Sequence, residues 1–190
     1  VAAHLGLRGN SVDSVRAATR KELSRKILSR SDVSIPSHRL VKLRNQSQNS
    51  LDDVAYPCVC KPTRLSASRG VIRADSPAEL ESALERIEEI LLAEGTDPEL
   101  VALIEDYIPG EEIAVEGLLD DGELTLLAVF DKPNPLKGPY FEETIYVTPS
   151  RQSESVLSLV ENQLATACRE LGLRWGPVHA ECRINEDGVW

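Results

Sequence analysis

Lysine, small hydroxylated residues and glycine occur close together in residues 61–71, in an order that suits the binding of a phosphate group. Lys61 ends the apolar segment YPCVCKP directly before a proline, and a lysine at a strand end can reach a phosphate as a point charge. In the loop that follows, TRLSASRGV, small residues let backbone N–H groups approach phosphate oxygens, and Arg69 adds a positive charge. The small residues are Ser66, Ser68 and Gly70. A solvated strand end and an ordinary serine-rich turn are the structural alternatives.

Carboxylates stand at two later positions that suit a nucleotide and a cation. In IEDYIPGEE, we expect a strand to leave one lobe with a free backbone edge at Tyr107 and Ile108, which can pair with an adenine edge. Glu112 follows, and its carboxylate can accept hydrogen bonds from ribose hydroxyls. In HAECR, Glu181 alternates with apolar neighbours, and a carboxylate that points into a cleft suits Mg²⁺. An acidic loop without a ligand and a salt bridge are the alternatives.

A third region, DKPNPLKGPYFEETIYVTPS (131–150), is rich in proline and glycine between two expected strands. Within it Lys132, and either Glu142 or Glu143, are candidates to face reacting groups. A structural loop that braces the lobe is the alternative. Common catalytic motifs are absent: the sequence has no GxxxxGK[ST], GxGxxG or HExxH, and none of its 3 histidines lies in a nucleophile motif. These absences argue against a P-loop enzyme, a Rossmann dehydrogenase, a zinc enzyme and a serine hydrolase.

Helices are expected where apolar residues recur at helical spacing behind a capping residue. Residues 11–30 fit this pattern, with Asn10 or Ser11 as the cap and a break near Thr19 and Arg20. Residues 77–94 follow the cap Ser76 and a proline at the first helical position, and Gly95 ends the helix. A third helix is expected over residues 153–171.

Strands are expected between these helices, with a hairpin turn at Asp120-Asp121-Gly122 and a loop or short helix over residues 45–53. The expected strands are residues 38–43, 58–61, 70–74, 101–107, 112–119, 123–132, 144–148 and 176–184. Antiparallel hairpins beside helices predict an α+β fold of two lobes, divided near residues 107–110.

Charge is distributed unevenly along the 190 residues, whose formal net charge is −10. Residues 1–73 hold 14 basic and 5 acidic side chains, whereas acidic residues dominate the rest. The negative total argues against general affinity for nucleic acid or anionic membranes, and the basic part suits a smaller anion. No apolar run reaches the roughly 18 residues that span a bilayer, so a cytoplasmic location is expected. The 4 cysteines form no CxxC pair and are expected to be buried and free; the absence of methionine suggests an internal part of a longer protein.

The order of these segments resembles that of the ATP-grasp superfamily. The segments RAATRKELSRKIL, DVSIPSHRLV, YPCVCKP, SASRGV, LIEDYIPGEEIAVEG and GPVHAECRINEDG are similar, in sequence and spacing, to the core of ATP-grasp carboxylate-amine ligases. The similarity is greatest to the L-amino-acid ligase and carnosine-synthase-like branch. It implies two lobes with antiparallel sheets, flanking helices and a nucleotide held between them. It implies residues 1–54 as a helical linker and the start of this region, residues 55–108 as the first lobe with the phosphate loop, and residues 109–190 as a truncated second lobe.

The resemblance also implies roles for individual residues. Lys21 and Lys61 are similar to the two lysines that hold the ATP phosphates, and residues 66–71, which end at Val71, to the mobile loop that closes over them. Glu105, Tyr107 and Ile108 resemble the hinge that binds adenine, Glu112 resembles the ribose-binding acid and Glu181 the first Mg²⁺-binding carboxylate. Lys61, Arg69 and Lys132 are the expected catalytic residues.

The activity that the resemblance implies is ATP-dependent activation of a carboxylate as an acyl phosphate, followed by attack of an amine, with an amino acid on one side. The expected cofactors are ATP and Mg²⁺, and the expected partners are a small carboxylate and a small amine, with a homodimer as one option for the whole protein. A second metal-binding acid, an Asn-Pro-Arg segment and a substrate domain of the family are missing, so these 190 residues alone are expected to be inactive. The alternatives are a non-catalytic nucleotide-binding module and a purine-pathway or carboxylase-type enzyme of the same superfamily.

Overall fold

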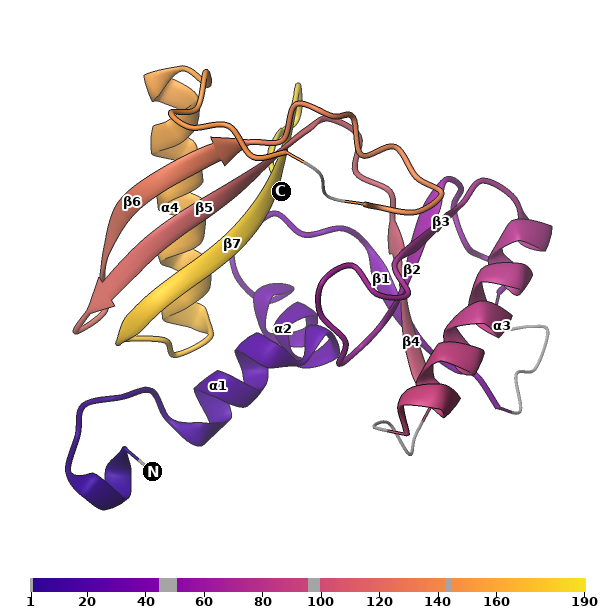
Figure 1. Ribbon diagram of the computed structural model, residues 1–190, viewed down its shortest axis with the longest axis horizontal. Helices are drawn as coiled ribbons and strands as arrows, with labels where there is room; N and C mark the ends of the chain where they lie inside the picture. The colour runs from indigo at the N-terminus through magenta and orange to yellow at the C-terminus, as the bar shows by residue number, and fades with distance from the viewer. Residues whose placement is uncertain (1, 45–50, 96–99, 143–144) are drawn as a thin grey trace. The chain divides into compact units, whose positions relative to one another are not determined.

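The computed structural model describes residues 2–44, 51–95, 100–142 and 145–190, which form two compact units (Figure 1). Unit 1 consists of Val1–Ile35, Pro109–Pro135 and Thr144–Trp190, and unit 2 of Pro36–Ile108 and Leu136–Glu143. The chain therefore passes from one unit to the other at four points. One of these points, between Ile108 and Pro109, lies in the region where the sequence predicts a division between lobes.

Unit 2 is a four-stranded antiparallel sheet with one long helix. The strand order is β1-β4-β2-β3, so strands distant in sequence are neighbours in the sheet. The elements are β1 (His38–Lys42), β2 (Cys58–Pro62), β3 (Ile72–Ala74), α3 (Pro77–Glu94) and β4 (Val101–Asp106). Helix α3 runs beside the sheet (Figure 1) and buries its apolar side against it.

The core of unit 2 lies between α3 and one face of the sheet. Cys58 and Cys60 of β2 are fully buried there beside α3 residues such as Leu80 and Ile87. All 4 cysteines are free and buried, as expected. The Cys60 thiol donates a hydrogen bond that, against the effect of burial, lowers the pKa of Cys58, and the same bond raises the pKa of Cys60. Because side chains alternate along a strand, Lys61 and Glu105 lie on the opposite face of the sheet.

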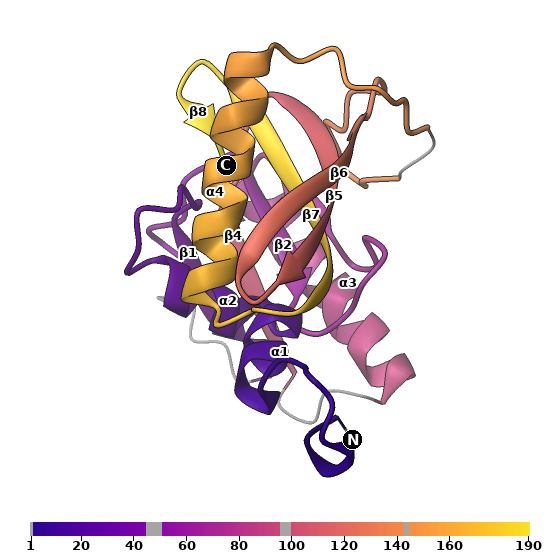
Figure 2. The same cartoon turned by 90° about the vertical axis from the view of Figure 1, so that its left-hand side faces the viewer.

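Unit 1 contains a second antiparallel sheet, in the order β6-β5-β7-β8, with a helix across one face (Figure 2). Its core joins α4 residues Val160 and Leu164 to strand residues such as Ile113, Val115 and Cys182. Burial raises the pKa of Cys182 to about 11. The elements are the 3₁₀ helix η1 (Ala3–Leu5), α1 (Val12–Thr19), α2 (Lys21–Leu28), β5 (Glu111–Asp120), β6 (Glu123–Asp131), α4 (Glu154–Glu170), β7 (Gly176–Asn185) and β8 (Gly188–Val189).

The helix boundaries confirm the sequence predictions closely. Ser76 caps α3 by accepting a hydrogen bond from the Glu79 amide, and Gly95 ends it in the left-handed conformation. Ser153 caps α4 in the same way. Ser11, rather than Asn10, caps α1, and the predicted break separates α1 from α2 at Arg20.

Asn10 instead attaches the N-terminal segment to unit 1. Its side-chain oxygen accepts hydrogen bonds from the amides of Arg174 (2.7 Å) and Trp175 (2.9 Å), and its Nδ2 donates to the Trp175 carbonyl (2.7 Å). The Ser34 amide donates to Gln163 of α4 at 3.2 Å. These contacts explain why residues up to Ile35 belong to unit 1, so the compact units do not follow the expected boundary at residue 54.

The prediction of a strand over residues 144–148 is wrong. Within residues 144–148, the part that the structure describes pairs only through Val147, which forms an isolated antiparallel bridge with Asp131. The hairpin at Asp120-Asp121-Gly122 is confirmed between β5 and β6. Part of the loop expected over residues 45–53 lies outside the described residues. No helix among the described residues is both long and apolar enough to cross a membrane.

Candidate functional site

In unit 2, the two charged residues expected at the phosphate and adenine positions form an ion pair. The Lys61 ammonium on β2 contacts the Glu105 carboxylate on β4. The strand register pairs Val59 with Glu105 and Lys61 with Leu103, so the pair is diagonal across two neighbouring strands. The Lys61 side chain is 18% exposed and that of Glu105 is 3% exposed. Lys61 therefore offers a cation whose position is set by a buried carboxylate.

The expected phosphate loop follows Lys61 directly and has an unusual backbone. Ala67 and Ser68 have φ values of 56° and 53°, a region that non-glycine residues seldom adopt. Gly70 has φ +73°, and a Cβ there would lie 2.8 Å from Cγ of Pro62, so glycine is required on both grounds. Ser66 is exposed, Ser68 and Val71 are half-buried, and the Val71 amide donates to the Ser68 carbonyl at 3.1 Å.

Arg69 of this loop forms an ion pair with Glu94. Its Nη1 lies 2.6 Å from Oε1 of Glu94 at the end of α3, with the two side chains 50% and 34% exposed. An ion pair this exposed contributes about 1 kcal/mol or less, so a bound phosphate can displace it at small cost.

The structure corrects the expected free backbone edge at the end of β4. The Tyr107 amide donates to the Pro57 carbonyl at 3.1 Å, which extends the pairing of β4 with the chain before β2. An adenine contact at Tyr107 therefore cannot use this N–H in the arrangement described. The hinge role of Tyr107 and Ile108 stays a prediction.

A second charged cluster lies in unit 1, on the face of its sheet opposite α4. Glu112 on β5 forms two ion pairs. Its Oε1 lies 2.8 Å from Nζ of Lys132, and its Oε2 lies 2.9 Å from Nη2 of Arg183. Lys132 also contacts Oε1 of Glu181 on β7. Two carboxylates and two cations alternate in this cluster, and the Lys132 side chain is only 3% exposed.

Glu181 has the chemistry expected of a Mg²⁺ ligand, but no cluster of carboxylates within the described part of the chain completes a site around it. Its side chain is 42% exposed, and its Oε1 contacts the Lys132 ammonium. Among the described residues, no group of three or more His, Cys, Asp or Glu side chains is arranged to hold a metal ion. A single exposed carboxylate fits the way Mg²⁺ binds beside nucleotide phosphates, where phosphates and water supply most ligands.

The remaining expected residues are dispersed. Lys21 is the first residue of α2 and belongs to unit 1, whereas Lys61 belongs to unit 2. Glu142 is exposed, and Glu143 lies outside the described residues. Sequence reasoning missed the role of Arg183, which faces Glu112 directly in the β5–β7 register. Arg183 stands in the same HAECR segment as Glu181, but only the strand register identifies Glu112 as its partner.

The part of the protein that the structure describes has two antiparallel sheets. Each is covered by a helix on one face and bears lysine–carboxylate pairs on the other. Solved structures with the same arrangement show the class to which the protein belongs. The L-amino acid ligase from Bacillus licheniformis superposes on all of this chain with a TM-score of 0.82 and 26% identity, and 43% of that chain is covered. A D-alanine–D-alanine ligase from Bacillus anthracis complexed with ATP shares the fold, with a TM-score of 0.75, 21% identity, and coverage of 100% of this chain and 59% of that chain. The two-lobed α+β fold expected from the sequence is thereby confirmed.

The sequence comparisons identify the family. The ATP-grasp domain matches residues 54–190, and the chain belongs to the ATP-grasp family. The alanine–anticapsin ligase of Bacillus subtilis (strain 168) is 26% identical over 196 residues, covering 95% of this chain. The match takes up 41% of that relative, so the chain spans about two fifths of its length.

Proposed function

We propose that this chain is the ATP-binding part of a ligase that activates a carboxylate as an acyl phosphate and joins it to an amine, with an amino acid as one substrate. The observation that carries this proposal is the similarity of the whole chain to an L-amino acid ligase, at 26% identity and a TM-score of 0.82. An alanine–anticapsin ligase that covers 95% of the chain supports the same substrate class.

The proposed reaction brings anions together. A carboxylate oxygen attacks the γ-phosphorus of ATP, the bond to the bridging oxygen breaks, and ADP leaves. The amine then attacks the carbonyl carbon of the acyl phosphate, the carbon–oxygen bond to phosphate breaks, and the amine loses a proton as the amide forms. Cations must neutralise the phosphate charge during the first step, and an ATP-grasp site provides them from lysine, arginine and Mg²⁺.

Within unit 2, Lys61 and the loop of residues 63–71 are the proposed phosphate contacts. Glu105 orients the Lys61 ammonium, because the ion pair holds it beside a buried carboxylate. Arg69 becomes a second cation when its exposed contact with Glu94 breaks. Closure of the loop would keep water away from the acyl phosphate.

Within unit 1, Glu112, Lys132 and Glu181 are the proposed ribose, catalytic and metal-binding residues. Glu181 would hold Mg²⁺, which supplies positive charge beside the transferred phosphate. Lys132 would lose its contact with Glu181 when Glu181 takes a cation, and would keep its contact with Glu112. Lys21 is proposed as a further phosphate contact. A cytoplasmic location and a homodimer are parts of the proposal to be checked by cell fractionation and sedimentation.

The test has two stages. Calorimetry with the 190-residue chain measures ATP binding with and without Mg²⁺, and a panel of amino acids tests amide formation and phosphate release by the full-length natural protein. We expect Mg²⁺-dependent ATP binding in the first stage and amino-acid-dependent phosphate release in the second. ATP binding without turnover of any carboxylate and amine would favour a nucleotide-binding module. Absence of ATP binding would overturn the proposal.

A further inference from the structure

Arg73 of β3 joins parts of unit 2 that are far apart in sequence. Its Nε lies 2.6 Å from Oδ1 of Asp75, and its Nη1 donates to the Lys137 carbonyl at 2.8 Å. Its guanidinium carbon lies 4.3 Å from the centroid of the Tyr107 ring, within the range of a cation–π contact. The side chain is 22% exposed. The Arg73 guanidinium thus contacts a carboxylate, a carbonyl and an aromatic ring at the same time.

The carbonyl belongs to residues 136–142, here called the edge segment, which lies beside β3. The Arg73 amide donates to the Pro139 carbonyl at 2.8 Å, and Ile72 and Tyr140 form an antiparallel bridge. At Gly138, with φ +90°, a Cβ would lie 2.8 Å from Cβ of Arg73, so glycine permits this close approach. The edge segment therefore lies against β3 through an isolated bridge and the backbone hydrogen bond of Arg73.

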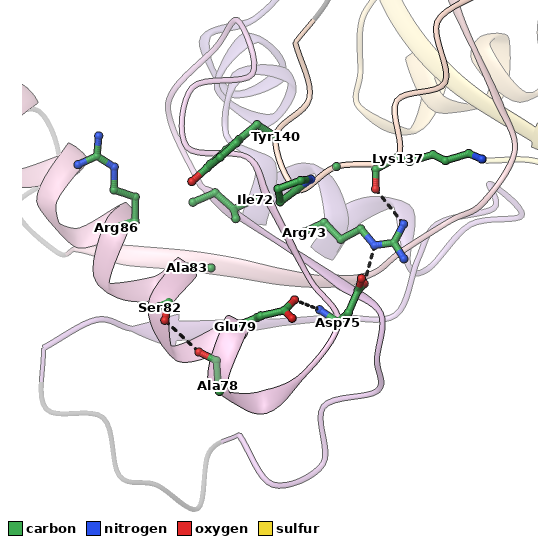
Figure 3. Close-up of a pocket in the computed structure, with 12 residues that line it drawn as sticks. Ile72, Arg73, Asp75, Ala78, Glu79, Ser82, Ala83, Arg86, Lys137 and Tyr140 are labelled. Atoms are coloured by element: carbon green, nitrogen blue, oxygen red, sulfur yellow. Dashed lines mark hydrogen bonds and ion pairs between the residues drawn. The ribbon is translucent and has the colours of Figure 1, made fainter.

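The edge segment does not pack tightly on α3. A hollow of about 640 Å³ lies between them, lined on one side by residues of α3 and on the other by Lys137, Gly138, Pro139 and Tyr140 (Figure 3). Figure 3 shows the Arg73 guanidinium hydrogen-bonded both to Asp75 and to the Lys137 carbonyl, at one end of this hollow. The edge segment is thus held to β3 through its backbone, and the Arg73 side chain adds a further contact.

We propose that Arg73 is a positioning residue that fixes the Tyr107 ring and the edge segment together, so that nucleotide binding beside Tyr107 stabilises the edge segment. The second half of this inference rests on the proposed function, which places adenine at the end of β4. The first half does not, because Arg73 and the two residues that it contacts, Tyr107 and Lys137, all belong to unit 2. Lysine cannot replace arginine here, since an ammonium lacks the planar fork that serves two acceptors and a ring at once.

Cleavage by endoproteinase Lys-C after Lys137 measures attachment of the edge segment directly. We expect Arg73→Gln to be cut there at least tenfold faster than wild type without nucleotide, and Arg73→Lys to be cut faster as well. Arg86→Gln is the matched control, because Arg86 lines the same hollow but pairs with Glu89 on α3. It should be cut at the wild-type rate. Circular dichroism shows which variants are folded. If Arg73→Gln is unfolded, Arg73→Lys still tests the proposal.

The same cleavage in the presence of ATP tests the coupling. ATP should slow cleavage after Lys137 in wild type and Arg86→Gln but not in Arg73→Lys, whose ATP affinity should fall about tenfold. Tyr107→Leu should lose the effect of ATP, because the ring that Arg73 contacts is then absent. Equal cleavage rates for wild type and both Arg73 variants without nucleotide would overturn the positioning role. Equal slowing by ATP in all variants would overturn the coupling, and absence of ATP binding to wild type would instead count against the proposed function.

Discussion

The ammonium group of Lys61 contacts the carboxylate of Glu105 across neighbouring antiparallel strands, on the sheet face opposite α3. Glu105 is almost fully buried, and a buried carboxylate is costly unless it is paired or hydrogen-bonded. A phosphate that binds Lys61 must share the ammonium with Glu105. The pair therefore serves stability and the proposed nucleotide site at once, and the two roles need separate variants.

Lys61→Met should destabilise the protein by about 3 kcal/mol, because it takes the ammonium away from a buried carboxylate. The double variant Lys61→Met/Glu105→Gln should recover a large part of this loss, since no buried charge remains. Urea unfolding followed by circular dichroism measures both. Lys42→Met, at an exposed position of the same sheet, is the control and should change stability by less than about 0.5 kcal/mol. A double variant no more stable than Lys61→Met would show that the two charges do not depend on each other.

The double variant also separates folding from nucleotide binding. It is expected to be folded and to bind ATP at least tenfold more weakly, because the proposed phosphate contact is gone. Calorimetry on the folded double variant gives this result directly. Wild-type ATP affinity in that variant would remove Lys61 from the phosphate site.

Glu181→Gln should weaken binding of Mg²⁺·ATP about tenfold and leave binding of ATP in EDTA unchanged, since the carboxylate is proposed to act only through the cation. Its effect on stability should be small because the side chain is 42% exposed. Glu116→Gln is a suitable control, because Glu116 is equally exposed on the neighbouring strand and pairs with His179 instead. Equal weakening with and without Mg²⁺ would contradict a metal role for Glu181.

Gly70→Ala should cost about 2–3 kcal/mol, through the left-handed backbone and contact of the new methyl group with Pro62. Gly95→Ala is matched to it, because Gly95 has a similar φ of +63° with no heavy atom within 4 Å of the added Cβ. It should cost only the backbone term of about 1 kcal/mol. The difference between the two, measured by urea unfolding, isolates the contact with Pro62. Equal losses would mean that the loop moves away from Pro62 without cost.

Features set by local sequence were predicted well. Ser76, Pro77 and Gly95 each act on the backbone within a turn of their own position, and the boundaries of α3 follow from them. The break at Arg20 and the hairpin at Asp121 are local in the same sense. The family was also predictable, because its motifs are continuous segments.

The partners of the charged side chains were not predictable, since they depend on strand order. β4 lies between β1 and β2, and only this order brings Glu105 to Lys61 and the Pro57 carbonyl to the Tyr107 amide. Arg183 meets Glu112 through a register between strands about seventy residues apart. Single residues such as Arg73 carry no local signal of a partner in a distant loop.

Asp131 provides a prediction about pH. Burial raises the pKa of its carboxyl group, but hydrogen bonds from Ser150 Oγ (2.5 Å), the Arg151 amide (2.9 Å) and the Arg151 guanidinium outweigh burial and hold this pKa below its ordinary value. A lowered folded-state pKa gives stability that is complete above the unfolded-state pKa, near 3.9, and is lost as the pH falls through the folded-state pKa.

Wild type should therefore exceed Asp131→Asn in stability by about 1–2 kcal/mol above about pH 5, and the difference should shrink as the pH falls below about 4. Ser150→Ala removes one of the donors and should show a smaller loss with the same dependence on pH. Urea unfolding at pH values from about 3 to 7 measures both variants against wild type. A difference between wild type and Asp131→Asn that stays constant over this range would show that ionisation of the Asp131 carboxyl group does not stabilise its contacts with Ser150 and Arg151 at the end of β6.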